Sequence, residues 1–327
     1  MGTKLDVAFK FGAGRYIQEP DALKLAGGEI GRFGHHALVI GGPTALDIAG
    51  EPLRRSLCDA CVTHEFVVYP GYNTREAANH YAAYCKKNSF DVVVGVGGGK
   101  IMDLAKSIAH MAELPVVNIP TQAATCAAYT PMSVMYTEEG AAYGTVGGNF
   151  YHDYEVSAVI IDETVMIHQP PRYAASGILD AMAKFIEVQH GHASMPFNDF
   201  NIELYTAYYL SKYTYDILKE TCLKVYDDIR EHRLTKEVHD FLFINFALTS
   251  VISGVSKAFG QTALAHEMYY CARMFFTNDS LSYLHGEIVG TSLILQLYYN
   301  GTPEKIPEFR NFMKRMEMPV TLKELGI

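Results

Sequence analysis

The first half of the chain alternates short apolar runs with amphipathic, helix-like segments. Runs rich in β-branched residues cover positions 37–40, 65–69, 91–96 and 116–119, and a fifth covers 156–162. Continuous apolar runs without polar alternation are typical of strands that are buried on both faces of a parallel sheet. The alternation therefore predicts a βαβ series, with a parallel sheet covered by helices.

After this series the pattern changes to helical periodicity. Long amphipathic stretches cover residues 174–192, 199–230, 235–258 and 260–276. We therefore predict two domains, an α/β domain at residues 1–165 and an all-α domain at residues 166–327. The sequence has no internal repeat, low-complexity tract or long flexible linker. The two domains are expected to pack closely, with a ligand cleft between them.

Composition narrows the class of protein. Apolar residues make up 49% of the 327 residues and charged residues 19%, as in ordinary globular enzymes. The net charge of −9 disfavours nucleic acid and anionic membranes as partners. The six cysteines are scattered, and the one CxxC pair has no second pair to complete a metal knuckle. With no signal-peptide core in the first 14 residues, these features predict a cytoplasmic protein with reduced thiols.

The sequence DVVVGVGGGKIMDLAK at residues 91–106 is the most informative segment. An apolar strand pattern ends in Gly97, Gly98 and Gly99, and an amphipathic helix pattern follows directly. Glycines let the backbone approach a ligand closely, and the free N–H groups of a helix N-terminus attract anions. We interpret this turn as a phosphate-binding site, although a tight strand-to-helix turn can require glycine for packing alone.

Three polar residues lie on separate apolar segments of the second half. They are Asp180 in SGILDAMAKFIEV, His266 in TALAHEMYY and His285 in YLHGEIVG. One carboxylate and two imidazoles are a plausible set of three ligands for a divalent metal, with an open position for substrate. Each residue taken singly is also compatible with a hydrogen-bonded core residue.

These segments, together with PTQAATCAAYTPMSVMYTEEG, resemble the iron-containing alcohol dehydrogenase superfamily and, within it, the glycerol dehydrogenase branch. The likeness extends from about residue 7 to the last residue. It implies a dinucleotide-binding α/β domain and a helical metal-binding domain, which is the dehydroquinate synthase-like fold of iron-type alcohol dehydrogenases. It also implies an NAD(P)-dependent dehydrogenase acting on CH–OH donors.

The resemblance assigns roles to individual residues. Asp180, His266 and His285 fall on the metal ligands of the family. Residues that match its cofactor site are Gly98, Gly99, Lys100, Asp103, Thr121, Thr130, Met132 and Tyr136. The implied mechanism is hydride transfer between a nicotinamide and a small secondary alcohol or ketone, with the metal polarising the substrate oxygen.

One departure from the family pattern concerns the metal. Iron-using members carry another histidine one helical turn after the aspartate, where this chain has Lys184. A cation cannot complete the coordination, so we expect zinc with three protein ligands rather than iron. A lysine that points at the metal would also weaken its binding. An Asp–Lys pair at this spacing equally supports any helix, without a functional role.

A second departure concerns the substrate. Glycerol dehydrogenases carry an aspartate that accepts hydrogen bonds from polyol hydroxyls, where this chain has Cys126. The surrounding string resembles the hydroxycarboxylate dehydrogenases of the same branch, and the loss of a negative charge suits an anionic substrate. We therefore expect a 2-hydroxy acid and its 2-oxo acid as the substrate pair, with glycerol and dihydroxyacetone as the alternative. Cys126 could equally be a space-filling residue.

A third departure concerns the cofactor. NAD-preferring relatives carry an acid at the end of the second strand, where this chain has Gly41 and Gly42. NADP(H) should therefore be tolerated or preferred, with Arg75 and His36 as candidates to hold its phosphate. The chain also ends at MPVTLKELGI, where relatives continue, so we expect either a truncated form or a different closure of the helical domain.

Two other classes of function remain open at this stage. A dehydroquinate synthase-like lyase would need several basic residues around its substrate, and a non-catalytic cofactor-binding protein would show no turnover. Relatives form homo-oligomers, and we expect the same here. The tyrosine-rich segment around Tyr205, Tyr208 and Tyr209 could serve an interface or pack in the core.

Overall fold

The computed structural model describes residues 9–143, 148–189, 202–257 and 263–327. The chain divides into two compact units. The first comprises Met1–Gln122 and Ala127–Gln169, and the second comprises Ala123–Cys126 and Pro170–Ile327. The predicted boundary after residue 165 lies just inside the first unit, and the short segment Ala123–Cys126 joins the helical unit.

The first unit is built on a six-stranded sheet. Its order is β1 (Tyr16–Glu19), β8 (Ala158–Asp162), β5 (Val116–Pro120), β4 (Val92–Gly97), β2 (His36–Gly41) and β3 (Thr63–Val68), and every neighbouring pair is parallel. The parallel α/β domain predicted from the apolar runs is confirmed. Strand β1 was not predicted, because its four residues are half-buried or exposed and give no apolar run.

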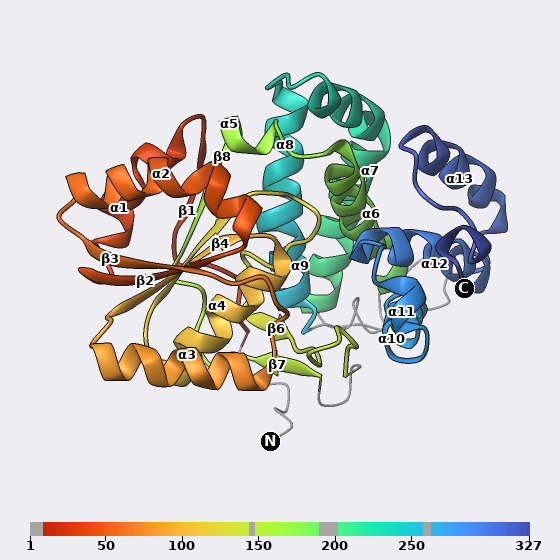
Figure 1. Ribbon diagram of the computed structural model, residues 1–327. Helices are drawn as coiled ribbons and strands as arrows, with labels where there is room; N and C mark the ends of the chain where they lie inside the picture. The colour runs from red at the N-terminus through yellow and green to blue at the C-terminus, as the bar shows by residue number, and fades with distance from the viewer. Residues whose placement is uncertain (1–8, 144–147, 190–201, 258–262) are drawn as a thin grey trace. The chain divides into compact units, whose positions relative to one another are not determined.

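Helices cover both faces of this sheet. Figure 1 shows α1 (Ala26–Ile30) and α2 (Pro43–Asp59) on one face, and α3 (Arg75–Asn88) and α4 (Gly99–Ala112) on the other. Helix α4 packs closely on β4, since a Cβ at Gly95 would lie 2.6 Å from the Ala105 Cβ. The unit also contains η1 (Ala22–Lys24), α5 (Glu163–Met166), and an antiparallel pair formed by β6 (Met132–Val134) and β7 (Asn149–Tyr151).

The second unit is helical in the residues that the structure describes. Its elements are α6 (Pro171–Val188), α7 (Ile202–Arg230), α8 (Lys236–Phe243), the π-helical turn η2 (Ile244–Leu248), α9 (Thr249–Val255), α10 (Leu264–Phe275), α11 (Thr277–Ser280), α12 (His285–Tyr299), η4 (Pro303–Lys305), α13 (Ile306–Arg315) and η5 (Lys323–Leu325). The helix predicted at 235–258 is interrupted by the π-helical turn, and parts of the other predicted stretches lie outside the described residues.

Helix α6 forms the core of this unit, and glycines bring its neighbours close to it. A Cβ at Gly177 would lie 1.9 Å from the Ala123 carbonyl oxygen. A Cβ at Gly286 of α12 would lie 1.9 Å from the Ser176 carbonyl oxygen. The helix therefore packs backbone to backbone on two sides, and the residues that it carries are held firmly.

One helical stretch, Lys236–Val255, is long and apolar enough to cross a membrane by length and composition. It has a mean hydropathy of 1.5, and 67% of its most apolar window is buried inside the protein. Such burial is typical of a core helix in a soluble protein.

Candidate active site

The three predicted metal ligands converge in the second unit. Asp180 on α6, His266 on α10 and His285 on α12 place one ligand atom each within 4.8 Å of one another. The Asp180 Oδ1 atom lies 3.5 Å from Nε2 of both histidines. Asp180 and His266 are buried, and the His285 side chain is 23% exposed. The cluster is thus buried on the side of Asp180 and His266, and solvent or a ligand can approach it on the side of His285.

Glu187 holds His266 in one orientation, and the sequence reasoning missed it. Its carboxylate accepts a hydrogen bond of 2.9 Å from the His266 backbone N–H and pairs with the ring Nδ1 atom. An Nδ1–H donated to Glu187 leaves the lone pair on Nε2, the atom that faces Asp180. A glutamate two helical turns after Asp180 in an otherwise apolar helix was the available signal.

His285 is fixed by the start of its helix. It is the first residue of α12, and its ring packs edge-on against Tyr269 with centroids 4.2 Å apart. Glu287 caps this turn by accepting from the Leu284 N–H at 2.7 Å, and Arg172 of α6 donates to Glu287 at 2.6 Å. The ion pair therefore ties the helix that carries His285 to the helix that carries Asp180.

Lys184 contributes a positive charge to the same cluster. Its Nζ lies 3.4 Å from the Asp180 Oδ1 atom, and both side chains are buried. Burial opposes the charged form of each residue, but the neighbours outweigh it. Lys184 and the two histidines hold the pKa of Asp180 well below its usual range, and Asp180, Cys126 and Glu187 raise the pKa of Lys184.

The histidines are shifted in opposite directions. Burial disfavours the charged form of both rings, but the Glu187 carboxylate outweighs it and raises the pKa of His266. For His285 burial prevails and lowers the pKa.

These donors fit a divalent metal ion. A carboxylate oxygen and two imidazole nitrogens converge, and the tautomer of one imidazole is set by a carboxylate behind it, as is usual at zinc sites. Lys184 offers no lone pair while it is protonated. The site therefore supplies three protein ligands and one adjacent positive charge.

The glycine turn lies in the first unit at the carboxyl end of β4. Gly97 has a φ of +152°, a conformation that favours glycine, and Gly98 is the N-cap of α4. A Cβ at Gly98 would lie 2.2 Å from the Gln122 Nε2 atom. The Thr121 N–H donates to the Gly97 carbonyl at 3.0 Å. This hydrogen bond places Thr121 next to the turn that contains Gly98 and Gly99. This turn fits the pyrophosphate of a dinucleotide.

Lys100 and Tyr136, two further predicted cofactor residues, both contact the ring of Tyr72. The Lys100 Nζ atom lies 3.8 Å from the centroid of the Tyr72 ring, and the Tyr136 ring lies 5.6 Å from the same ring. Lys100 is the second residue of α4 and Tyr136 follows β6, so Tyr72 connects the glycine turn with the segment after that strand.

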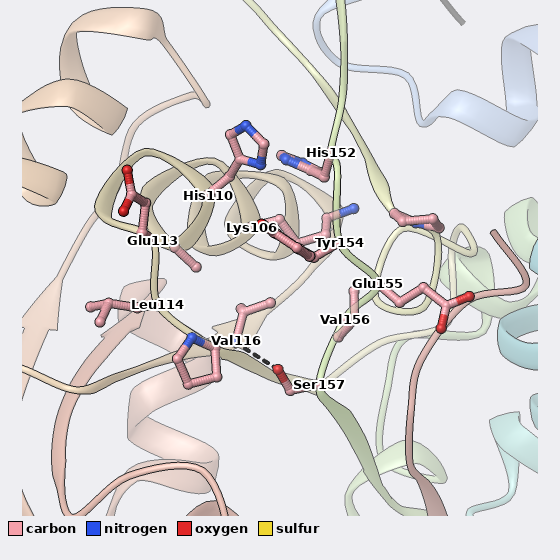
Figure 2. Close-up of a pocket in the computed structure, with 13 residues that line it drawn as sticks. Lys106, His110, Glu113, Leu114, Val116, His152, Tyr154, Glu155, Val156 and Ser157 are labelled. Carbon is pink, nitrogen blue, oxygen red and sulfur yellow. Dashed lines mark hydrogen bonds between the residues drawn. The ribbon is translucent and has the colours of Figure 1, made fainter. Parts of the chain in front are cut away.

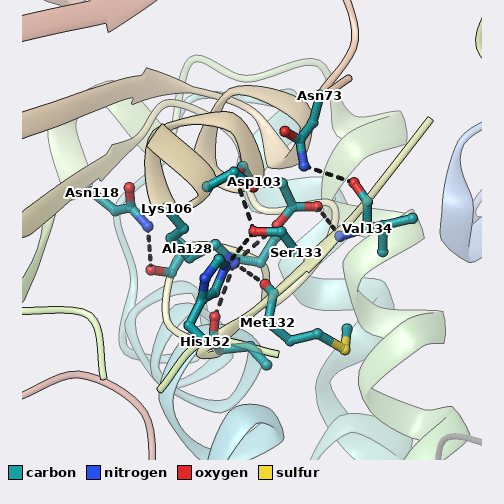
Figure 3. Close-up of polar contacts among 12 residues, drawn as sticks. Asn73, Asp103, Lys106, Asn118, Ala128, Met132, Ser133, Val134 and His152 are labelled. Carbon is teal, nitrogen blue, oxygen red and sulfur yellow. Dashed lines mark hydrogen bonds and ion pairs between the residues drawn. The ribbon is translucent and has the colours of Figure 1, made fainter. Parts of the chain in front are cut away.

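A buried lysine that the sequence reasoning missed organises the remaining predicted cofactor residues (Figure 3). Lys106 donates to the carbonyls of Ala127 at 2.7 Å, Thr130 at 2.9 Å and Met132. It also pairs with Asp103 at 2.9 Å. Asp103 additionally accepts from the Val134 N–H at 3.1 Å, and its pKa is raised by burial. Both carboxylate oxygens of Asp103 thus have partners within the protein.

The end of β2 carries no acid. The strand ends at Gly41, and Gly42 is the N-cap of α2. His36 lies at the opposite end of β2, where its ring packs on Phe90, so it is not a candidate to hold a phosphate beside Gly42. This corrects the sequence-based suggestion. Arg75 begins α3 and is exposed.

Comparison with known proteins places the chain in a class of oxidoreductases. Residues 13–160 match the family described as iron-containing alcohol dehydrogenase. The structure resembles that of glycerol dehydrogenase from Schizosaccharomyces pombe, with a TM-score of 0.85, 24% identity, and coverage of 100% of this chain and 80% of that one. The fold is therefore that of the iron-type alcohol dehydrogenases.

Sequence relatives specify the branch. A glycerol dehydrogenase from Thermotoga maritima is 27% identical over 96% of this chain and 84% of its own length. Hydroxycarboxylate dehydrogenase A from Escherichia coli K12 is 28% identical over 72% of this chain and 63% of its own length. The chain thus resembles the iron-containing alcohol dehydrogenase family over residues 13–160, and its relatives are consistent with the glycerol dehydrogenase branch, as its motifs predicted. This resemblance implies NAD(H) and a divalent metal ion as cofactors.

Proposed function

We propose that the protein is a metal-dependent NAD(P)(H) oxidoreductase whose main substrates are a small polyol and its hydroxyketone, such as glycerol and dihydroxyacetone. The observation that carries the proposal is the convergence of Asp180, His266 and His285, with Glu187 setting the tautomer of His266. Relatives named glycerol dehydrogenase that match nearly the whole chain favour the polyol over the 2-hydroxy acid that the sequence suggested.

Each residue has a role that follows from its position. Asp180, His266 and His285 would hold a divalent ion, which supplies Lewis acidity and lowers the pKa of a bound alcohol. The glycine turn would hold the dinucleotide, whose nicotinamide exchanges the hydride. Lys106 fixes the segment after Ala127 through three backbone carbonyls, so Thr130 and Met132 keep a constant position.

The charges of the cluster favour a negative oxygen. Lys184 is positive, Asp180 and Glu187 are negative, and a divalent ion would bring the sum of these four charges to +1. A net positive site stabilises an alkoxide more than the neutral alcohol, and this difference is what accelerates proton loss.

A 2-hydroxy acid is the second candidate, and Cys126 is the observation in its favour. Cys126 belongs to the same unit as the cluster and contributes to the raised pKa of Lys184, so its thiol lies near that ammonium. A thiol is negatively charged only when it is deprotonated, so it leaves more of the positive charge available to a substrate carboxylate than an aspartate at this position would. One of the relatives is a hydroxycarboxylate dehydrogenase.

Further details belong to the same proposal. Three protein ligands, with no further histidine as the fourth ligand, favour zinc over iron. The absence of an acid after β2 favours acceptance of NADP(H). We also propose a cytoplasmic homo-oligomer without nucleic acid or membrane partners, in keeping with the net charge of −9.

Initial rates of NADH and NADPH oxidation by zinc-loaded protein test the substrate, with dihydroxyacetone and 2-oxobutyrate compared at equal concentration. We expect faster turnover of dihydroxyacetone. The Cys126→Asp variant should lower activity on 2-oxobutyrate more than on dihydroxyacetone, because it places a carboxylate beside Lys184. A preference of the wild type for 2-oxobutyrate would reverse the order of the two candidates.

The His266→Ala variant tests the metal. It should lose metal and turnover while it retains dinucleotide binding, because the glycine turn belongs to the other unit. Full activity of this variant would refute the metal assignment. Failure to oxidise NAD(P)H with any small ketone would favour a lyase or a non-catalytic protein.

A further inference from the structure

The first unit contains a pocket of about 540 Å³ that the proposed function does not use (Figure 2). Its walls are the last turns of α4, the start of β5 and the segment that precedes β8. Val116 begins β5, whereas the glycine turn follows the end of β4. Because the strands are parallel, the pocket lies at the amino-terminal ends of the strands, and the predicted dinucleotide site lies at their carboxyl ends.

His152 lines this pocket and has a buried ring nitrogen without a hydrogen-bond partner among the described residues. The Ser133 hydroxyl donates to the Asp103 carbonyl at 2.9 Å, so its oxygen must accept at 2.7 Å from an Nε2–H of His152. The proton is then on Nε2, and Nδ1 carries a lone pair. His152 is only 4% exposed, and in the described part of the chain its Nδ1 has no hydrogen-bond partner. Burial, reinforced by the Lys106 charge, lowers the pKa of His152 well below its usual value and keeps it neutral.

His110 supplies a second ring nitrogen of the same kind. Its Nε2 lies 3.8 Å from an Asp153 carboxylate oxygen, which favours the proton on that nitrogen. Its Nδ1 is buried, again with no hydrogen-bond partner among the residues described. The Phe150 ring packs edge-on against both imidazoles with centroids 4.9 Å apart and restricts their rotation.

The two rings have nearly the same centroid distance and tilt as the two histidines of the candidate metal centre. The His110 and His152 centroids are 5.3 Å apart with planes tilted by 54°, and those of His266 and His285 are 5.3 Å apart and tilted by 52°. In Figure 2 the imidazoles of His110 and His152 lie side by side. The Nε2–H of His152 is hydrogen-bonded to Ser133, which is the arrangement that prepares a histidine for metal binding, and the Nε2 of His110 is near the Asp153 carboxylate.

We propose that His110 and His152 bind a second transition-metal ion of the zinc class through their Nδ1 atoms. Water from the pocket completes the coordination, since among the described residues only Asp180, His266 and His285 bring three such ligands together. Lys106 lines the same pocket, but Asp103 and three carbonyls surround its ammonium group and reduce its repulsion of an ion.

An ion at this position would be structural. His110 belongs to α4, and His152 follows β7 and holds Ser133 of β6. The ion would link the β6–β7 pair to the end of α4.

Zinc titration by calorimetry tests the proposal on full-length, metal-stripped protein with alkylated thiols. The wild type should bind two equivalents. His110→Asn and His152→Asn should each lose one equivalent, while His80→Asn, an exposed histidine of the same unit, should keep both. His266→Ala should lose the other equivalent and keep this one, so failure of this proposal is separable from failure of the proposed active site.

Two outcomes would overturn the inference. One is a single equivalent in the wild type that His266→Ala removes, which would mean that water alone satisfies the two Nδ1 atoms. The other is an unchanged second equivalent in both asparagine variants. If the asparagine variants do not fold, a second experiment uses Cu²⁺ bound to the His266→Ala protein. Its electron paramagnetic resonance spectrum should show splitting from two imidazole nitrogens. A spectrum without nitrogen splitting would refute the site. Ser133→Ala should weaken the second equivalent about 10- to 100-fold.

Discussion

Replacement of Lys184 by methionine should strengthen metal binding at the candidate active site. Methionine preserves most of the side-chain volume and removes only the ammonium, which lies 3.4 Å from the Asp180 Oδ1 atom. An ion about 2.1 Å from that oxygen would be at most about 5.5 Å from the Lys184 Nζ atom. At an effective dielectric constant of about 20, charges of +2 and +1 at this distance repel by about 6 kcal/mol.

The measured effect should be smaller than this value, because the exposed side of His285 admits water, which screens the repulsion. We therefore expect the zinc dissociation constant of Lys184→Met to fall at least about 100-fold, which corresponds to about 2.7 kcal/mol. Competition with a chromophoric chelator gives the dissociation constant directly, without reliance on turnover.

Thermal unfolding tests the same reasoning independently, because Lys184→Met should lower the melting temperature without zinc and increase the rise that zinc produces. In the metal-free variant Asp180 loses its buried partner, and removal of one member of a buried pair costs about 3–5 kcal/mol. The melting temperature of metal-free Lys184→Met should therefore fall below that of the wild type, and saturating zinc should raise it more than in the wild type. Lys212→Met, which removes an exposed lysine paired with Asp216 at the same spacing, should change neither quantity. A zinc dissociation constant within threefold of the wild-type value would refute the electrostatic reasoning.

Three further predictions concern the packing and charges around the site. Gly177→Ala should destabilise the protein by about 3 kcal/mol or more, because its Cβ would lie 1.9 Å from a carbonyl oxygen, whereas Gly28→Ala, in open space, should not lower the melting temperature. Glu187→Gln should weaken zinc binding about 10- to 100-fold in the chelator assay, and an unchanged dissociation constant would contradict its role behind His266. Burial opposes the charged form of Asp228, but hydrogen bonds from neighbouring cations and a hydroxyl outweigh it and lower the pKa of this residue. Asp228 therefore stabilises the fold fully above the unfolded pKa of about 3.9. This contribution is lost as the pH falls through the lower pKa of the folded state. In urea unfolding, Asp228→Asn should therefore lose less stability than the wild type between about pH 5 and pH 3.

The sequence predicted the elements that have a strong period and missed those that depend on partners distant in the chain. Strands β2, β4 and β5 were recognisable because they are continuous apolar runs between turns. Strand β1 and the β6–β7 pair were not, because their burial comes from neighbours rather than from their own composition. Substrate preference was equally out of reach, since it depends on what surrounds Cys126 in space.

The same contrast holds within the candidate site. Asp180, His266 and His285 stood out as polar residues in apolar segments, and the resemblance to a known family assigned them as metal ligands. Glu187 and Lys106 have the same property, but their role depends on which atom they meet across the fold. Glu187 meets the proton-bearing nitrogen of His266, and Lys106 meets three carbonyls of one loop. Spacing along the chain does not contain this information.

The pairing of Lys184 with Asp180 explains why a cation next to the metal ligands can be tolerated. Backbone contacts at Gly177 and Gly286 hold α6, the helix that carries both residues, against its neighbours. Because Asp180 pairs with Lys184 when no ion is bound, the cluster is stabilised by one cation or the other. Lys184 thereby allows the protein to fold without metal, at the expense of metal affinity. A metal-free Lys184→Met variant that melts below the metal-free wild type, and whose stability zinc restores, would show this exchange directly.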